Sequence, residues 1–167
     1  MKRKNFKIGL IVLTIGIVIA SCGGRSGSGG SGGLSGTWEY KYNENNAITI
    51  KLSGKTFTRE VISIDLEPMT KEQIIEQLTN MLNKEGVKFS QSKDKIEFSK
   101  DGREGIITFL GTENGQTKIE TRRIEKFTYS ITDDKIELID SKGSIDILSF
   151  SRTENTITID GQRLIKK

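Results

Sequence analysis

The chain of 167 residues contains no histidine, and its single cysteine is Cys22. It therefore lacks the commonest general base and metal ligand, and one cysteine cannot form an intramolecular disulfide. Carboxylates remain, but the adjacent Asp133 and Asp134 fall in a predicted turn, where solvated side chains are expected rather than a catalytic pair. We predict that the protein is not an enzyme and uses no metal or other cofactor.

A surplus of positive charge is also missing outside the N-terminus. The chain has 26 Lys and Arg and 22 Asp and Glu, and four of the basic residues precede Ile8. The remaining body has equal numbers of basic and acidic residues, whereas a nucleic-acid binder needs a basic surface against phosphate. The composition predicts no nucleic-acid partner.

Only one long apolar run is present, at residues 8–20, and it follows a cationic start. As a helix its 13 residues would span about 20 Å, less than the roughly 30 Å of a bilayer core. This pattern is typical of an export signal at residues 1–21, with a short uncleaved membrane anchor as the alternative.

The apolar run ends in Ile19-Ala20-Ser21-Cys22, which resembles the lipobox of bacterial lipoproteins. The resemblance implies cleavage between Ser21 and Cys22 and attachment of a diacylglyceryl group, with its fatty acyl chains, to the Cys22 sulfur. The membrane would then be a partner through Cys22. Gly23 replaces the Asp that retains some lipoproteins at the inner membrane, which favours the outer membrane or cell surface within the cell envelope.

A tether is predicted at residues 22–35, because residues 23–33 are Gly and Ser except for Arg25. Such a segment forms a flexible coil with a reach of roughly 20 Å. It would hold a folded body clear of the lipid headgroups.

Residues 36–167 alternate apolar and polar residues in short segments, separated by turn pairs such as Asn114-Gly115 and Asp160-Gly161. We predict one mainly β domain, an up-and-down antiparallel barrel or strongly curled meander of about 8–10 strands. One helix interrupts it near residues 71–85, with a capping box from Thr70 to Gln73 and a stop at Gly86. Its apolar stripe is expected to lie on the barrel, either as a lid or as a permanent plug.

Gly36-Thr37-Trp38, at the start of this body, is similar to the Gly-x-Trp opening of lipocalins and the wider calycin group. The resemblance implies a barrel floor in which an arginine near the last strand covers Trp38, with Arg163 as the first candidate and Arg152 as the second. It also implies a body that binds a small apolar or amphiphilic ligand, and we expect that body to be monomeric. Tyr40 and Tyr42 are able to stack on such a ligand, with a place in the ordinary core as the alternative. The alternative is a filled barrel whose surface binds a protein partner, such as a host factor or an inhibited enzyme.

One long segment carries charge toward the expected interior. Alternation from Ile119 to Ile131 places Arg123 and Glu125 in phase with Phe127 and inward, if the strand is unbroken. Arg123 could then receive an anionic ligand headgroup. A bulge near residues 122–126 would instead turn both charges outward.

Overall fold

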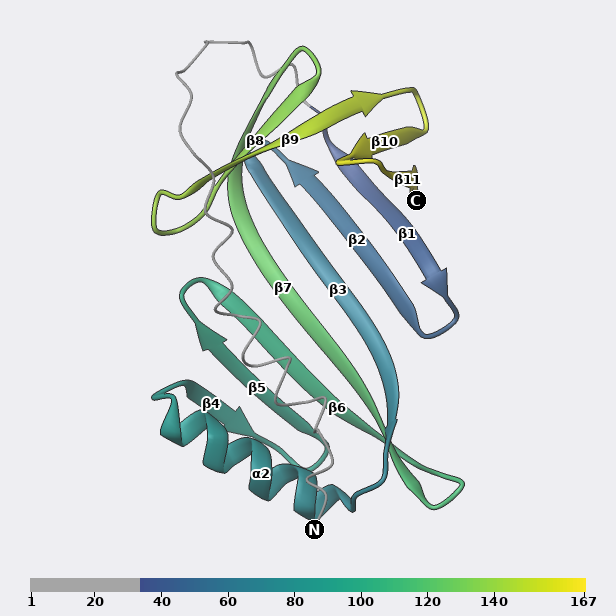
Figure 1. Ribbon diagram of the computed structural model, residues 1–167, viewed down its shortest axis with the longest axis vertical. Helices are drawn as coiled ribbons and strands as arrows, with labels where there is room; N and C mark the ends of the chain where they lie inside the picture. The colour runs from purple at the N-terminus through teal and green to yellow at the C-terminus, as the bar shows by residue number, and fades with distance from the viewer. Residues whose placement is uncertain (1–33) are drawn as a thin grey trace. The chain divides into compact units, whose positions relative to one another are not determined.

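The computed structural model describes residues 34–167 (Figure 1), so the predicted signal, Ser21, Cys22 and most of the tether lie outside the described residues. The described part contains eleven strands and one helix. Their bounds are β1 (Gly36–Asn43), β2 (Asn46–Ser53), β3 (Thr56–Glu67), α2 (Lys71–Lys84), β4 (Lys88–Gln91), β5 (Lys95–Lys100), β6 (Arg103–Glu113), β7 (Gln116–Thr132), β8 (Lys135–Ile139), β9 (Ile145–Arg152), β10 (Thr156–Ile159) and β11 (Gln162–Lys166).

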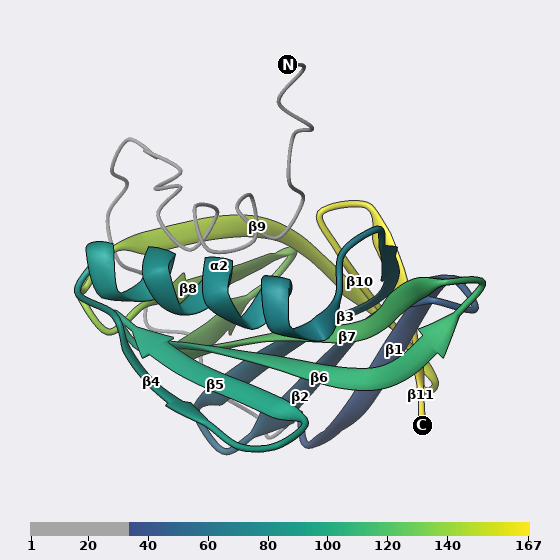
Figure 2. The same ribbon diagram turned by 90° about the horizontal axis from the view of Figure 1, so that it is seen from below.

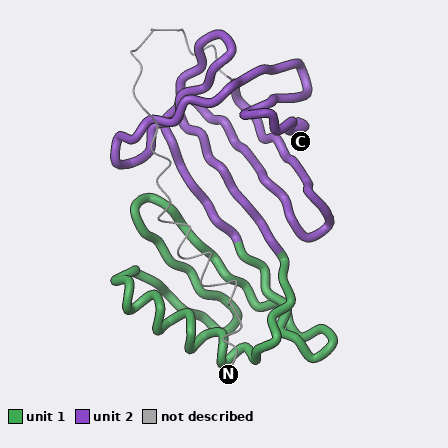
Figure 3. Tube along the Cα trace, in the orientation of Figure 1, with its two compact units in different colours: residues 1–19, 64–121 green, residues 20–63, 122–167 purple. Residues whose placement is uncertain are grey.

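The described chain divides into two compact units (Figure 3). The barrel unit consists of residues 34–63 and 122–167, and the helical unit of residues 64–121. The boundary falls within β3 and within β7, the two longest strands. No linker-like composition marks either boundary, so this division could not be predicted from the sequence.

The barrel unit contains a closed antiparallel barrel of eight strands, which confirms the predicted mainly β barrel with one helix. The hydrogen-bonded order is β3-β2-β1-β11-β10-β9-β8-β7, and β7 pairs with β3 to close the ring. Hairpins set most of the registers; on β1 and β2, for example, Trp38 lies opposite Ile50 and Tyr40 opposite Ile48. Closure leaves no unpaired strand edge in the ring, which removes a common route to aggregation.

The barrel core is built from the inward-facing apolar residues of these strands, and Trp38 is 2% exposed within it. Gly36 makes room for the indole: a Cβ at residue 36 would lie 2.9 Å from Trp38 Cη2. The Gly-x-Trp sequence is therefore a packing unit. The other buried members of this core are Ile50, Leu52, Phe57, Phe127, Tyr129, Ile136, Leu138, Phe150, Ile157, Ile159 and Leu164.

The structure corrects the expectation that Arg163 covers Trp38. Arg163 is exposed, whereas its neighbour Leu164 is fully buried in the core. Successive residues of a strand face opposite sides of the sheet, so the register that buries Leu164 turns Arg163 outward. The β11 residue opposite Trp38 is Lys166.

β7 is a single strand of 17 residues, and the predicted bulge does not occur. Phe127 and Tyr129 face inward and are buried. Glu125 lies two residues before Phe127, so its side chain faces the same way, and it is 5% exposed. Arg123 has the same phase and is half-buried. The unbroken-strand alternative was the correct one.

In the helical unit, α2 lies along one face of the sheet formed by β4, β5 and β6 (Figure 2). The stripe of Ile74, Leu78 and Leu82 is fully buried against residues of this same unit, so the expectation that the helix packs on the barrel is wrong. Its ends are as predicted. The N-terminal capping box is present at Thr70, and Gly86, with φ of 64°, ends the helix.

Gly105 provides a stability test within the helical unit. It lies opposite Phe98, and a Cβ at residue 105 would come within 2.2 Å of Phe98 Cζ. Because Phe98 is enclosed in the core, we expect Gly105→Ala to lower the free energy of unfolding by about 1–3 kcal/mol, measured by urea unfolding followed by circular dichroism. Combining it with Phe98→Leu should restore part of the loss, and unchanged stability of the single variant would contradict this packing.

Candidate functional site

The interior of the barrel unit has an apolar half built around three aromatic rings. Phe57 packs edge-to-face against Phe127, with ring centroids 5.9 Å apart, and against Tyr129 at 6.5 Å. The Tyr129 hydroxyl donates a hydrogen bond to the Leu34 carbonyl oxygen at 3.1 Å, and burial raises the pKa of Tyr129. All three rings belong to the buried core of the barrel unit.

An ion pair borders the apolar half. Arg59 on β3 donates from Nε and Nη2 to Glu125 Oε2 on β7, at 2.8 and 2.5 Å. The Glu125 side chain is 6% exposed and that of Arg59 is 38% exposed, and the guanidinium also lies 5.9 Å from the Phe127 ring centroid. The pairing explains how a carboxylate is tolerated inside the barrel, because an unpaired buried charge would be very costly.

Arg59 retains hydrogen-bonding capacity beyond this pair. A guanidinium has five N–H groups, and two of those on Arg59 donate to Glu125. The other three make no hydrogen bond to any residue in the described part of the chain. With more than a third of its side chain exposed, Arg59 can still bind an acceptor that reaches it.

A pocket of about 300 Å³ lies at the end of the β2–β3 ladder. We call it the mouth pocket; its lining residues are Tyr42, Asn46, Ala47, Val61 and Ile62. Val61 is two residues from Arg59 on β3, so both side chains point to the same face of the strand. Phe57 follows in the same phase. Neither Arg59 nor Glu125 lines the pocket, however, and the lining also includes Ile62, which has the opposite phase to Val61.

Two tyrosines form an aromatic wall beside this pocket. The rings of Tyr40 and Tyr42 are perpendicular, with centroids 4.6 Å apart, and Gln162 Nε2 donates to the Tyr42 hydroxyl. Tyr42 is half exposed and Tyr40 half-buried, so neither belongs to the fully closed core. The structure thus brings the two predicted tyrosines together, while Arg123 is not among the residues that line the pocket.

The sequence analysis missed Arg59, which pairs with the charge that it did identify. Arg59 and Glu125 are 66 residues apart, and no local pattern links them. The available signal was the alternation of β3, which puts Arg59 in phase with Phe57 and Val61. A second ion pair joins the same two strands, between Arg122 Nη1 and Glu60 Oε1 at 3.2 Å. Glu60 directly follows Arg59 on β3, so this pair lies on the outer face of the sheet.

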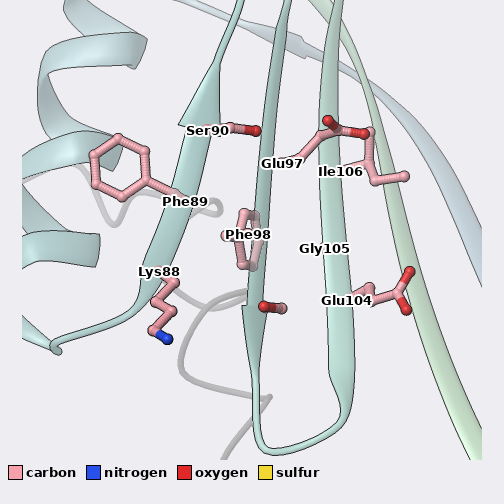
Figure 4. Close-up of a pocket in the computed structure, with 9 residues that line it drawn as sticks. Lys88, Phe89, Ser90, Glu97, Phe98, Glu104, Gly105 and Ile106 are labelled. Atoms are coloured by element: carbon pink, nitrogen blue, oxygen red, sulfur yellow. The ribbon is translucent and has the colours of Figure 1, made fainter.

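A second pocket, also of about 300 Å³, lies on the helical unit (Figure 4). Phe89 points toward α2 in this view, and Phe98 is buried in the core beneath the helix, so the residues of opposite phase face away from the helix. These are Lys88, Ser90, Glu97, Ser99, Glu104 and Ile106. Glu97 already pairs with Lys95 at 2.5 Å, and the mixed charges on an open sheet face define no ligand class.

Within residues 34–167, no group of three or more Asp, Glu, His or Cys side chains is arranged to hold a metal ion. The helix in this range is too short and too polar to cross a bilayer. No protein family, no curated protein and no solved structure matches the chain. The barrel is therefore established by the structure itself, while membership of the lipocalin group and of the lipoproteins remains a prediction.

Proposed function

We propose that the protein is an exported lipoprotein, anchored in the cell envelope through Cys22, whose barrel unit binds a small apolar or amphiphilic ligand. The observation that supports binding most strongly is the mouth pocket, which lies at the end of the β2–β3 ladder of a closed barrel and has the Tyr42 ring in its lining. An eight-stranded barrel is wide enough for one small ligand where side chains do not fill it. We propose binding rather than catalysis as its role.

The lining of the mouth pocket is suited to an amphiphile. Val61 and Tyr42 offer apolar surface, and Tyr40 packs against Tyr42. Asn46 and the nearby Arg59 offer hydrogen-bond donors. Small-molecule sites commonly combine apolar walls with a few polar groups that orient the ligand, and about 300 Å³ is at the small end of their range.

The only tryptophan of the chain allows a direct binding test. Trp38 lies opposite Ile50, and Ile50 lies opposite Arg59, so the indole occupies the same cross-strand row as the ion pair. We would reconstitute the full chain in phosphatidylcholine vesicles and titrate octanol, octanoate and octylammonium while recording Trp38 emission. A saturable change with at least one amphiphile is expected. A response to all three that is absent or merely linear would overturn the proposal.

The anchor is tested separately by Cys22→Ser. If acylation at Cys22 holds the protein on the membrane, the variant should accumulate in its unprocessed form or appear in the soluble fraction, because two or more acyl chains are needed for stable anchoring. Cell fractionation with intact-mass measurement gives the answer. A variant that stays membrane-bound at the mature mass would show that another mechanism anchors it.

The alternative role, binding of a protein partner, is favoured by a different observation. Ile145 and Ile147 on β9 and Ile165 on β11 are each more than 40% exposed, and they have the opposite phase to the buried Phe150 and Leu164 of the same strands. Exposed apolar side chains can form part of a docking surface. This role requires no ligand in the mouth pocket, so the same titration separates the two.

A further inference from the structure

We infer that one end of the barrel unit is a docking surface for an anionic phospholipid bilayer, the membrane in which Cys22 is anchored. The inference rests on the proposed function, because it requires the acyl anchor, and it adds the orientation of the body on the membrane. The mouth pocket lies at the opposite end of the barrel, so a ligand would enter it from the aqueous phase.

The up-and-down order of the strands gives the barrel unit two distinct ends. The anchor end carries the start of β1, the end of β11 and the hairpins β2–β3, β7–β8 and β9–β10, and we define it as residues 34–36, 53–56, 132–135, 152–156 and 165–167. The mouth end carries the hairpins β1–β2, β8–β9 and β10–β11, and we define it as residues 43–46, 139–145 and 159–162. In Figure 1 the β7–β8 hairpin lies at the top of the barrel unit and the β1–β2 hairpin at its lower end.

The chain enters the barrel at the anchor end. Leu34 is fixed there, because the Tyr129 hydroxyl donates to its carbonyl oxygen at 3.1 Å and its side chain packs against the barrel core. Cys22 comes twelve residues earlier, and an extended chain of that length spans at most about 40 Å. The anchor therefore keeps this end near the bilayer, while the orientation of the body depends on the surface that the barrel presents.

The two ends differ in charge. The anchor end has five basic and three acidic side chains, whereas the mouth end has one basic and three acidic side chains. An anionic bilayer attracts Lys and Arg, each strengthening the association about fivefold, and it repels a surplus of acidic groups. Electrostatic attraction therefore turns the anchor end toward the headgroups. The five basic residues of this end, all of them exposed, are Lys55, Lys135, Arg152, Lys166 and Lys167.

Four of these basic side chains can bind lipid phosphates without breaking an interaction of the protein. Lys167 pairs with Glu39 at 2.7 Å. The side chains of the other four make no ion pair with any residue between 34 and 167. Ammonium and guanidinium groups form strong, charge-assisted hydrogen bonds with phosphate oxygens.

Ile165 supplies an apolar contact at the same end. It is 60% exposed, more than any other exposed large hydrophobic residue in the described part of the chain. Lys166 and Lys167 follow it directly. This combination suits a membrane interface, because an apolar side chain can enter the boundary of the acyl chains while lysines keep their ammonium groups among the headgroups.

The test compares probes at the two ends of β2. Ser53→Cys lies at the anchor end and Asn45→Cys at the mouth end, and both positions are exposed. In the full chain acylated at Cys22, the introduced cysteine is the only free thiol and takes one fluorescent label. The protein would be reconstituted in vesicles of phosphatidylcholine and phosphatidylglycerol with a phospholipid that carries a nitroxide on its headgroup. Because the anionic headgroups hold the anchor end, we expect the nitroxide to quench the probe at residue 53 at least about twofold more than the probe at residue 45.

Variants of the anchor end should remove this difference in quenching. Lys166→Gln combined with Arg152→Gln, and separately Ile165→Ser, should make the two probes respond alike, as should vesicles of phosphatidylcholine alone. The matched control is Arg163→Gln, which removes an exposed arginine from the same strand beside the mouth end. It should leave the difference unchanged, and circular dichroism shows that each variant is folded.

The outcomes separate this inference from the proposed function. If the chain takes two labels because Cys22 carries no acyl group, or does not float with the vesicles, the proposed anchor fails and this inference fails with it. If the anchored protein shows equal quenching at both positions, or stronger quenching at residue 45, the anchor stands and the docking surface is overturned. A difference that persists in phosphatidylcholine alone, or in both sets of variants, overturns the assignment of anionic headgroups as the partner.

Discussion

Trp38→Ala is expected to lower the free energy of unfolding by about 3–5 kcal/mol, the usual range for a large buried aromatic residue. The indole is almost fully enclosed, it lies over Gly36, and it belongs to the core that joins strands from all around the barrel. Removing it leaves a cavity that the closed ring of strands cannot easily collapse to fill. Urea unfolding followed by far-ultraviolet circular dichroism measures the loss without needing the tryptophan signal.

Two further variants locate the source of that effect. Gly36→Ala should also lower the free energy of unfolding, but by less than Trp38→Ala, because the added Cβ would lie only 2.9 Å from the indole. Arg163→Ala should change stability by less than about 0.5 kcal/mol, as expected for an exposed residue. A large loss with Arg163→Ala would mean that the arginine does support the core, against the register described for β11.

Arg59→Ala is expected to have the second large effect, lowering the free energy of unfolding by about 2–4 kcal/mol. It leaves the Glu125 carboxylate enclosed without its guanidinium partner, and breaking a buried pair commonly costs 3–5 kcal/mol. Partial exposure of Arg59 places the expected loss toward the lower end, because water can reach the site.

The double variant Arg59→Met with Glu125→Leu should recover most of the loss, because it replaces both charges with apolar groups of similar size. Arg122→Ala is the control from the outer face and should cost less than about 1 kcal/mol. Equal losses for Arg59→Ala and Arg122→Ala would mean that Glu125 is solvated rather than buried.

Local patterns in the sequence predicted much of the fold correctly. Alternation with period two identified the strands, and turn pairs such as Asn114-Gly115 separated them; both residues of that pair have positive φ. The capping box at Thr70 and the stop at Gly86 identified α2 to within one residue. These signals succeed because each depends on a few neighbouring residues whose backbone preferences agree.

The features that the sequence did not reveal all depend on contacts between distant segments. The pairing of β3 with β7 creates both the closed barrel and the Arg59–Glu125 ion pair, and it is set by the assembled sheet rather than by any turn. Placing α2 on β4–β6 required knowing that these strands form a unit of their own. The alternation of β7 was enough to predict that Glu125 faces inward, but not that Arg59 is its partner.

The expectation for Arg163 failed for a related reason. It was transferred from a family resemblance, and the transfer assumed that the last strand has the same phase as in that family. Here the β10–β11 hairpin buries Leu164, with Ile157 opposite it, and so turns Arg163 outward. A shift of one residue in register exchanges the two faces of a strand.

Photo-crosslinking tests most directly whether the barrel binds its ligand at the mouth pocket. The vesicle-reconstituted full chain would be irradiated with octanoate that carries a diazirine in its chain, then digested and mapped by mass spectrometry. We predict adducts on residues 42–47 and 61–62, which contain the lining of the mouth pocket, and we expect excess unmodified octanoate to displace them. Adducts confined to the exposed segment 145–147, or adducts at the mouth pocket that excess octanoate does not displace, would contradict a ligand-binding barrel.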